Sequence, residues 1–112
     1  MLKEKRSNTL LTEDYLALLN APPKLFHPYR LLIVQTLKLH GSVEFRQLRH
    51  SIPEITDGKL ASHLNVLEKL KYVRYHKEII DRKLRTSYEI TEKGRADFEK
   101  LLISLKKMMK YE

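Results

Sequence analysis

Residues 56–70, TDGKLASHLNVLEKL, place hydrogen-bonding and small side chains along one face of a predicted helix. The opposite face carries leucines at helical spacing, namely Leu60, Leu64, Leu67 and Leu70. Hydroxyl, amine, carboxylate and imidazole groups on a helix can bond to the edges of bases or to phosphates, and small residues permit close approach. The residues predicted to bind DNA in this way are Thr56, Asp57, Gly58, Lys59, Ser62 and His63.

These side chains also have an ordinary structural interpretation. The polar face can simply be solvated, and His63 can pack against its own helix. We favour a binding role for Lys59 and Ser62, whereas the two interpretations of His63 are balanced. Asp57 would repel a phosphate, so it fits better as an acid at the helix start or as an acceptor for a cytosine amine.

A second candidate site is a cluster of positive charge over residues 69–85. This segment holds seven Lys or Arg against two acidic residues, a net +5 of the chain's total of +8. Clustered positive charge indicates a polyanionic partner, although hairpin tips are also charged for solubility. The cations predicted to reach the minor groove or its phosphates are Arg74, Lys77, Arg82, Lys83 and Arg85. Arg46 and Arg49 are further candidates for phosphate contacts or are ordinary surface arginines.

The remaining chemistry of the sequence argues against several classes of protein. Cysteine is absent, and the five histidines show no close pair of metal-ligand spacing, so we expect no metal and no cofactor. No Gly-rich phosphate loop or clustered carboxylates indicate an enzyme. No apolar run is long enough for a bilayer, and the first residues lack the apolar region of a signal peptide. We therefore expect a cytoplasmic protein with no membrane partner.

The elements that must position these residues form one predicted domain over residues 12–112, after a flexible segment 1–11. Thr12 and Pro22 bound a first predicted helix. Pro28 and Gly41 bound a second that is apolar almost all round and is therefore expected to be the central buried helix. The remaining predicted elements are a strand at 42–45, helices at 45–51 and 56–70, strands at 72–79 and 86–90 around a tip at 80–85, and a helix at 92–111 capped by Thr91. Val73, Tyr75 and Ile79 are expected to point inward.

Two helices joined by a short turn and followed by a basic hairpin predict a mainly α fold with a small β-hairpin wing, a winged helix-turn-helix with added terminal helices. The segments HPYRLLIVQTL, ITDGKLASHLNVLEKLKYV and TSYEITEKGR resemble winged-helix transcription regulators of the ArsR and MarR type, over roughly residues 24–100. The resemblance implies DNA-binding homodimers that pair through terminal helices, often repress, and sometimes respond to a small molecule. Without cysteine, sensing of metals by thiolates is excluded. DRKLR is similar to the Asp-Arg pair in the wing of MarR relatives, but Asp81 lies ten residues before Thr91.

An apolar stripe in the last helix extends to the C-terminus, beyond the expected end of a small core. The stripe either packs on the chain's own core or pairs with a second copy, together with leucines of the first helix. The predicted dimer residues are Leu16, Leu19, Leu101, Leu102, Leu105, Met108 and Met109.

Together these features predict a sequence-specific regulator of transcription that binds double-stranded DNA as a homodimer, with repression as the expected effect. Residues 56–70 would enter the major groove, and residues 72–90 would lie on the minor groove or the backbone. Two alternatives remain open at this point: a winged-helix module that binds proteins, and a chromatin-like protein indifferent to DNA sequence. A small-molecule effector also stays open, with no residue that indicates one.

Overall fold

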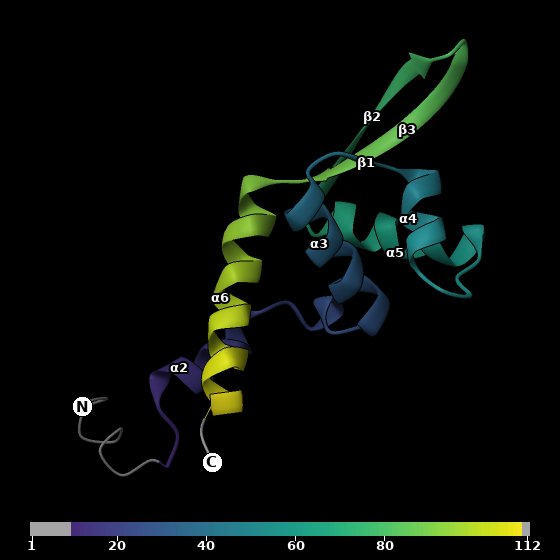
Figure 1. The fold of residues 1–112 in the computed structure, drawn as a ribbon. Helices are drawn as coiled ribbons and strands as arrows, with labels where there is room; N and C mark the ends of the chain where they lie inside the picture. Colours follow the sequence, from purple (N-terminus) through teal and green to yellow (C-terminus); the bar gives the residue numbers. More distant parts are fainter. Residues whose placement is uncertain (1–9, 111–112) are drawn as a thin grey trace.

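The structure, a computed structural model, describes residues 10–110, so most of the predicted flexible segment 1–11 lies outside the described residues. A helical body carries a long β-hairpin at one end, while α6 extends from the body in the other direction with α2 beside it (Figure 1). The elements are α2 (Glu13–Leu16), η1 (Ala17–Asn20), η2 (Pro23–Leu25), α3 (Pro28–His40), β1 (Val43–Glu44), α4 (Phe45–Ser51), α5 (Asp57–Lys69), β2 (Val73–Ile80), β3 (Lys83–Ile90) and α6 (Glu92–Lys110). None of the described helices combines the length and hydrophobicity that a bilayer crossing requires.

Helix α3 has the predicted bounds, with Pro28 in its first turn and Gly41 at its end with a φ of 78°. The expectation that it is buried almost all round was wrong. Ile33, Val34 and Leu37 are fully buried, but Leu32 and Leu39 are 52% and 65% exposed. The helix therefore lies at the edge of the core, with one apolar stripe turned inward.

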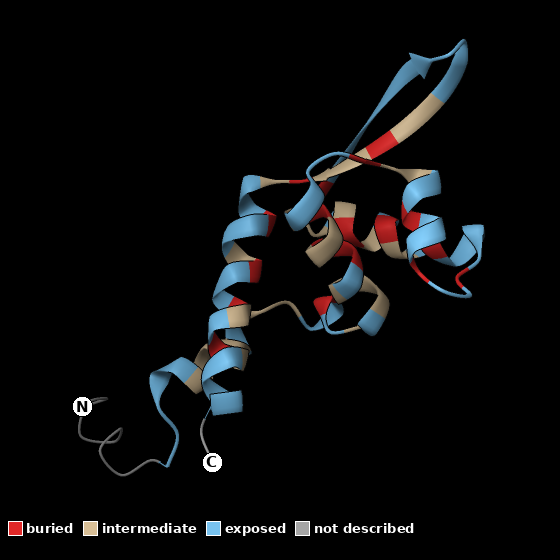
Figure 2. Ribbon diagram, in the orientation of Figure 1, coloured by how far each residue is buried: buried red, intermediate tan, exposed pale blue. Residues whose placement is uncertain are grey.

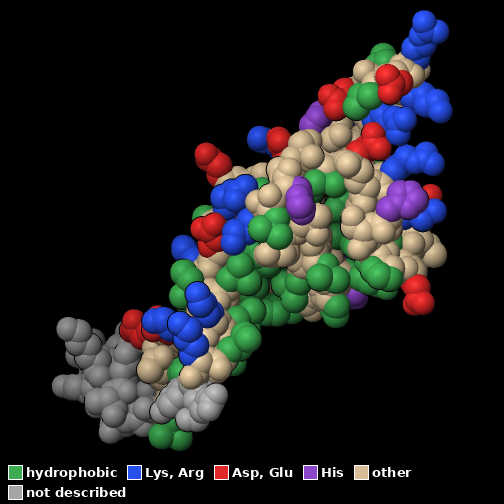
Figure 3. All heavy atoms as spheres, in the orientation of Figure 1, with side chains coloured by type: hydrophobic (Ala, Val, Ile, Leu, Met, Phe, Trp, Pro, Cys, Tyr) green, Lys and Arg blue, Asp and Glu red, His purple; other side chains and the backbone are tan. Residues whose placement is uncertain are grey.

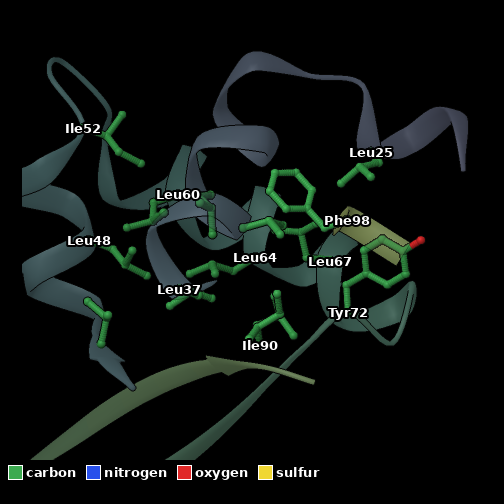
Figure 4. Packing of buried hydrophobic residues seen from close by; sticks show 14 of the residues in the cluster. Leu25, Leu37, Leu48, Ile52, Leu60, Leu64, Leu67, Tyr72, Ile90 and Phe98 are labelled. Atoms are coloured by element: carbon green, nitrogen blue, oxygen red, sulfur yellow. The ribbon is translucent and has the colours of Figure 1, made fainter. Parts of the chain in front are cut away.

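The two helices of the predicted helix-turn-helix are confirmed as α4 and α5. Glu44 and Gln47 form a reciprocal capping box at the start of α4. At the start of α5, the backbone N–H of Lys59 donates to the hydroxyl of Thr56 over 3.2 Å. The inward side chains of α5 are fully buried and pack against α3 and α4 in the core (Figure 4): Leu60, Leu64 and Leu67.

The hairpin is longer and its tip tighter than predicted. Strands β2 and β3 pair from Val73 opposite Ile90 to Ile80 opposite Lys83, and β1 pairs with the base of β3, so the strand order is β1-β3-β2. The tip contains only Asp81 and Arg82, both with positive φ (51° and 66°), as a two-residue hairpin turn requires.

The expectation that Tyr75 and Ile79 point into the core was wrong. Their side chains are 50% and 75% exposed, and only Val73 at the base of β2 is buried. The cause is the length of the strands, which carries most of the hairpin beyond the helical body (Figure 2). Strand alternation continues there, but no element of the described chain covers the face that it creates.

The first predicted helix is divided, because α2 ends at Leu16 and the 3₁₀ helix η1 continues to Asn20. Thr12 occupies the predicted cap position, but its side chain makes no capping hydrogen bond. Both short helices lie against α6, and Lys107 donates to Asp14 over 2.6 Å across this contact.

Helix α6 begins in close contact with the base of the hairpin. The Thr91 hydroxyl accepts from the N–H of Gly94 and donates to the carbonyl of Lys71, which confirms Thr91 as the cap. Tyr72 is fully buried, and its hydroxyl donates to Asp97 of α6 over 2.9 Å. This hydrogen bond lowers the pKa of the Asp97 carboxyl, and burial raises the pKa of the Tyr72 phenol.

Gly94 makes this contact possible. A Cβ atom at Gly94 would lie 2.4 Å from the carbonyl oxygen of Tyr72 and 3.0 Å from Cγ1 of Ile90. The first obstacle is backbone, which cannot rotate away as the end of a side chain can. A side chain at this position would therefore force α6 away from the hairpin base.

We predict that Gly94→Ala lowers the free energy of unfolding by about 2 kcal/mol or more, because the strands and α6 must separate to admit a methyl group. Urea denaturation monitored by circular dichroism measures this. Gly58→Ala is the matched control, since a Cβ at Gly58 meets nothing within 4 Å. Alanine is the better helix former, so the control should keep or slightly raise the stability. Equal stability of the two variants would contradict the role assigned to Gly94.

Candidate nucleic-acid interface

The polar face of α5 lies outward, as the spacing of its leucines predicts. Because Leu60, Leu64 and Leu67 are fully buried, the side chains on the opposite side of the helix are directed to solvent. Five of the six residues of this helix that are predicted to bind DNA are exposed, namely Thr56, Asp57, Gly58, Lys59 and Ser62. The small Gly58 has open space above it, so this end of α5 can approach another molecule closely.

Asp57 is neutralised by a residue of the preceding helix. Its carboxylate forms an ion pair with Nε of Arg49 in α4, and both side chains are largely exposed. The pair joins the two helices next to the N-terminus of α5. The pair also removes much of the repulsion that Asp57 would exert on a phosphate. Arg49, which was predicted to contact a phosphate, is engaged in this pair instead.

His63 differs from the other five residues that are predicted to bind DNA, because it packs against the start of α3. Its Nδ1 accepts a hydrogen bond from Nε of Arg30 over 3.1 Å. Its ring lies 4.4 Å from the ring of His27 and 5.4 Å from that of Tyr29. Burial and the neighbouring His27, Arg30 and Lys59 lower the pKa of His63, which disfavours the protonated ring. His63 thus holds α5 against α3.

Arg30 is a contributor that the sequence reasoning missed. Besides His63, its guanidinium donates to the carbonyl of Lys24 over 2.7 Å, so it joins η2, α3 and α5. Its position in the first turn of α3 carries no signal of this role, because its partners lie six and 33 residues away in the sequence.

Two of the five hairpin cations are paired with acids. Arg74 and Glu89 face each other across β2 and β3 at 2.5 Å, and Arg85 donates to Glu44 of β1 over 3.2 Å. Within the described chain, no ion pair involves the other three, which are exposed: Lys77, Arg82 and Lys83. Figure 3 shows Lys and Arg side chains along the projecting hairpin.

Two hollows lie between the hairpin and the start of α5. One hollow of about 280 Å³ lies between β3 and α4, and a second of about 220 Å³ lies between α4 and Asp57. Both border Phe45 and Arg46 in the first turn of α4, and we call the two hollows together the trough. Arg46 is exposed and has no ion-pair partner in the part of the chain that is described. The trough lining is Glu44, Phe45, Arg46, Arg49, His50, Asp57, Lys83, Leu84, Arg85, Thr86 and Tyr88.

The predicted dimer residues fall into three groups. Leu101 is only 3% exposed and belongs to the chain's own core, so it has no surface to offer a second copy. Three others are partly buried, namely Leu16, Leu102 and Leu105. The exposed members are Leu19, Met108 and Met109. Ile103 on α6 is also 55% exposed, although the sequence did not indicate it as a dimer residue. Within residues 10–110, no three His, Asp or Glu side chains gather as a metal site would require.

Comparison with known proteins supports the same fold. The family model for a winged helix DNA-binding domain matches residues 29–109. An uncharacterised protein of Methanocaldococcus jannaschii is 33% identical over 67 residues, which are 60% of this chain and 72% of that protein. The structure of a transcriptional regulator homologue from Pyrococcus horikoshii OT3 is 32% identical with a TM-score of 0.76, over 88% of this chain and 96% of that one.

A regulator of the MarR family from Enterococcus faecalis V583 shares the fold, with 22% identity, a TM-score of 0.69, and coverage of 92% of this chain and 91% of that one. These likenesses confirm the predicted winged helix-turn-helix and the expectation that the chain is not an enzyme, because the matched family consists of DNA-binding domains. The family match covers most of the described helices and the whole hairpin. The chain therefore belongs to the winged-helix DNA-binding domain family.

Proposed function

We propose that the protein is a sequence-specific regulator of transcription that places α5 in the major groove of double-stranded DNA. The observation that carries the proposal is the outward face of α5, where Lys59 and Ser62 are exposed beside a helix start that Thr56 caps. A helix whose N-terminal polar residues project freely has the geometry used to contact base edges. The relative from Pyrococcus horikoshii, described as a transcriptional regulator homologue, supports the regulatory part.

The trough between the hairpin and α5 is the proposed path of one phosphate backbone. Arg46 and Lys83 line it and have no ion-pair partner among residues 10–110, and Lys83 lies next to the hairpin tip. A duplex with α5 in its major groove has a phosphate strand beside that groove, followed by the minor groove, where the hairpin would lie. Phosphate contacts would supply most of the affinity, and the face of α5 would supply the choice of sequence.

The exposed apolar residues of η1 and α6 are the proposed surface for a second copy. Leu19 and Met109 are 81% and 80% exposed, and η1 lies against α6. A two-fold dimer through this surface would place two α5 helices on half-sites about 10 base pairs apart, or a multiple of that. Such a dimer acts in the cytoplasm by occupying its site and excluding other proteins from it, so we expect repression.

The first experiment measures whether α5 reads sequence. Fluorescence anisotropy at two salt concentrations should show salt-dependent binding of the protein to duplex DNA, and selection from a random pool should enrich a preferred sequence. In Lys59→Ala with Ser62→Ala, affinity for that sequence should fall about 10- to 100-fold, since each lost base contact costs about 1–3 kcal/mol. Asn65→Ala, on the exposed part of the same helix, is the control. Absence of salt-dependent binding to any duplex would overturn the proposal.

Arg46 and Arg49 should behave differently despite their proximity. Arg46→Ala should weaken binding about equally on all sequences and reduce the slope of log affinity against log salt by about 1. Replacing the ion pair, Arg49→Ala with Asp57→Ala, leaves the net charge unchanged and should leave the slope unchanged. Anisotropy titrations over a series of salt concentrations measure both slopes. A slope that the Arg46 variant leaves intact would exclude a phosphate contact there.

The dimer surface is tested by charge. We expect the protein to have the mass of a dimer by size-exclusion chromatography with light scattering, and Leu19→Glu with Met109→Glu to have that of a monomer. A carboxylate buried in an apolar interface without a partner is costly. Leu32→Glu, at an exposed apolar position of α3, is the control and should stay dimeric. A monomeric wild-type protein would refute this interface.

A further inference from the structure

The outer part of the hairpin carries an exposed aliphatic pair that the proposed function leaves unexplained. Ile79 and Leu84 are direct partners across the two strands, and their side chains are 75% and 66% exposed. Since opposite residues of an antiparallel pair point to the same side, both belong to one face of the hairpin. Lys77 and Thr86 are the next pair on that face toward the body, and Tyr75 and Tyr88 follow.

The opposite face of the hairpin has a different chemistry. Its pairs include Arg74 with Glu89 and Glu78 with Arg85, and the ion pair of Arg85 with Glu44 lies at its base. The charged side chains on this face are readily hydrated, although Ile80 beside the tip also belongs to it. A face of exposed aliphatic residues at the end of a long strand pair is not, and an exposed apolar strand invites association.

The aliphatic pair is directed toward the trough. Leu84 lines the same hollow as Arg46 and Lys83, between β3 and the first turn of α4. Ile79 is the cross-strand partner of Leu84, so the two side chains lie on the same face of the hairpin. The pair thus lies on the side of the hairpin that would meet DNA, one residue pair inside the tip that carries Arg82.

The charges near this pair indicate which kind of partner it fits. Lys77 lies on the same face, Arg82 lies at the tip, and Lys83 lies on the other face but lines the same hollow as Leu84. None of the three has an ion-pair partner among residues 10–110. Aliphatic side chains close to free cations match the minor groove of DNA, whose edges are phosphates and whose interior exposes sugars and stacked bases. A neutral apolar partner would leave the cations without counter-charges.

We propose that Ile79 and Leu84 form an apolar wedge that enters the minor groove, partly unstacks one base step and bends the duplex. The inference rests on the proposed function, since it requires α5 in the adjacent major groove. The wedge adds a source of sequence preference without hydrogen bonds to bases, because flexible pyrimidine–purine steps open at lower cost. Bends of about 20–90° accompany wedges of this kind.

The test compares the wild-type protein with Ile79→Thr and Leu84→Thr combined, which keeps strand-compatible residues and removes most of the aliphatic surface. The DNA is the duplex selected by the wild-type protein, labelled at both ends for energy transfer, and the readouts are bend and affinity. We expect the wild-type protein to shorten the end-to-end distance. The double variant should bind the same duplex about 10-fold more weakly and leave it nearly straight. Ile80→Thr, on the other face beside the same tip, is the control and should bend DNA normally.

The outcomes separate the wedge from the function on which it rests. If the wild-type protein binds no duplex, both proposals fail together. If it selects a sequence and loses this selection in Lys59→Ala with Ser62→Ala, but the double variant binds and bends like the wild type, only the wedge is overturned. A change from dimer to monomer in the double variant, measured by light scattering, would also overturn the wedge, since the pair would then be a contact between protein copies. Thermal unfolding of the double variant verifies that it is folded.

Discussion

The close approach of α6 to the base of the hairpin is the constraint on which the rest of the arrangement depends. Helix α5 ends at Lys69, and Lys71 just beyond it has a left-handed φ of 67°. The N–H groups of Lys71 and Tyr72 donate back to the carbonyls of Glu68 and Leu67. This turn places Tyr72 against α6, where only a glycine at position 94 leaves room for the carbonyl of Tyr72. The direction of β2 relative to α5 follows from these contacts, and so does the position of the hairpin beside α5.

The charge that the candidate DNA-binding surface presents depends on which cations are paired with acids as well as on how many cations there are. Arg49, Arg74 and Arg85 each meet an acid, so the net excess of positive charge does not describe what a polyanion would encounter. Pairs of exposed side chains contribute little to stability, but they orient the guanidinium groups and lower the local potential. Within residues 10–110, the cations that line the trough without an ion-pair partner are Arg46 and Lys83.

Much of the fold was accessible from local patterns. The leucine spacing of α5, the caps Thr56 and Thr91, and the bounding Pro28 and Gly41 all lie within a few residues of the elements that they define, and each prediction was confirmed. The errors came where burial depends on distant elements. Tyr75 and Ile79 alternate as inward strand residues do, yet the body ends before it reaches them.

The sequence by itself determined the order of the elements, the family and the polar face of α5, because helix period, capping and turn chemistry are local properties. The tertiary structure alone decided how the site residues are used. It turned His63 toward Arg30 of α3, paired Arg85 with Glu44 at a separation of 41 residues, and left Leu101 in the core. The physical reason is that pairing and burial depend on which groups meet in space, and in this chain those groups come from segments far apart in sequence.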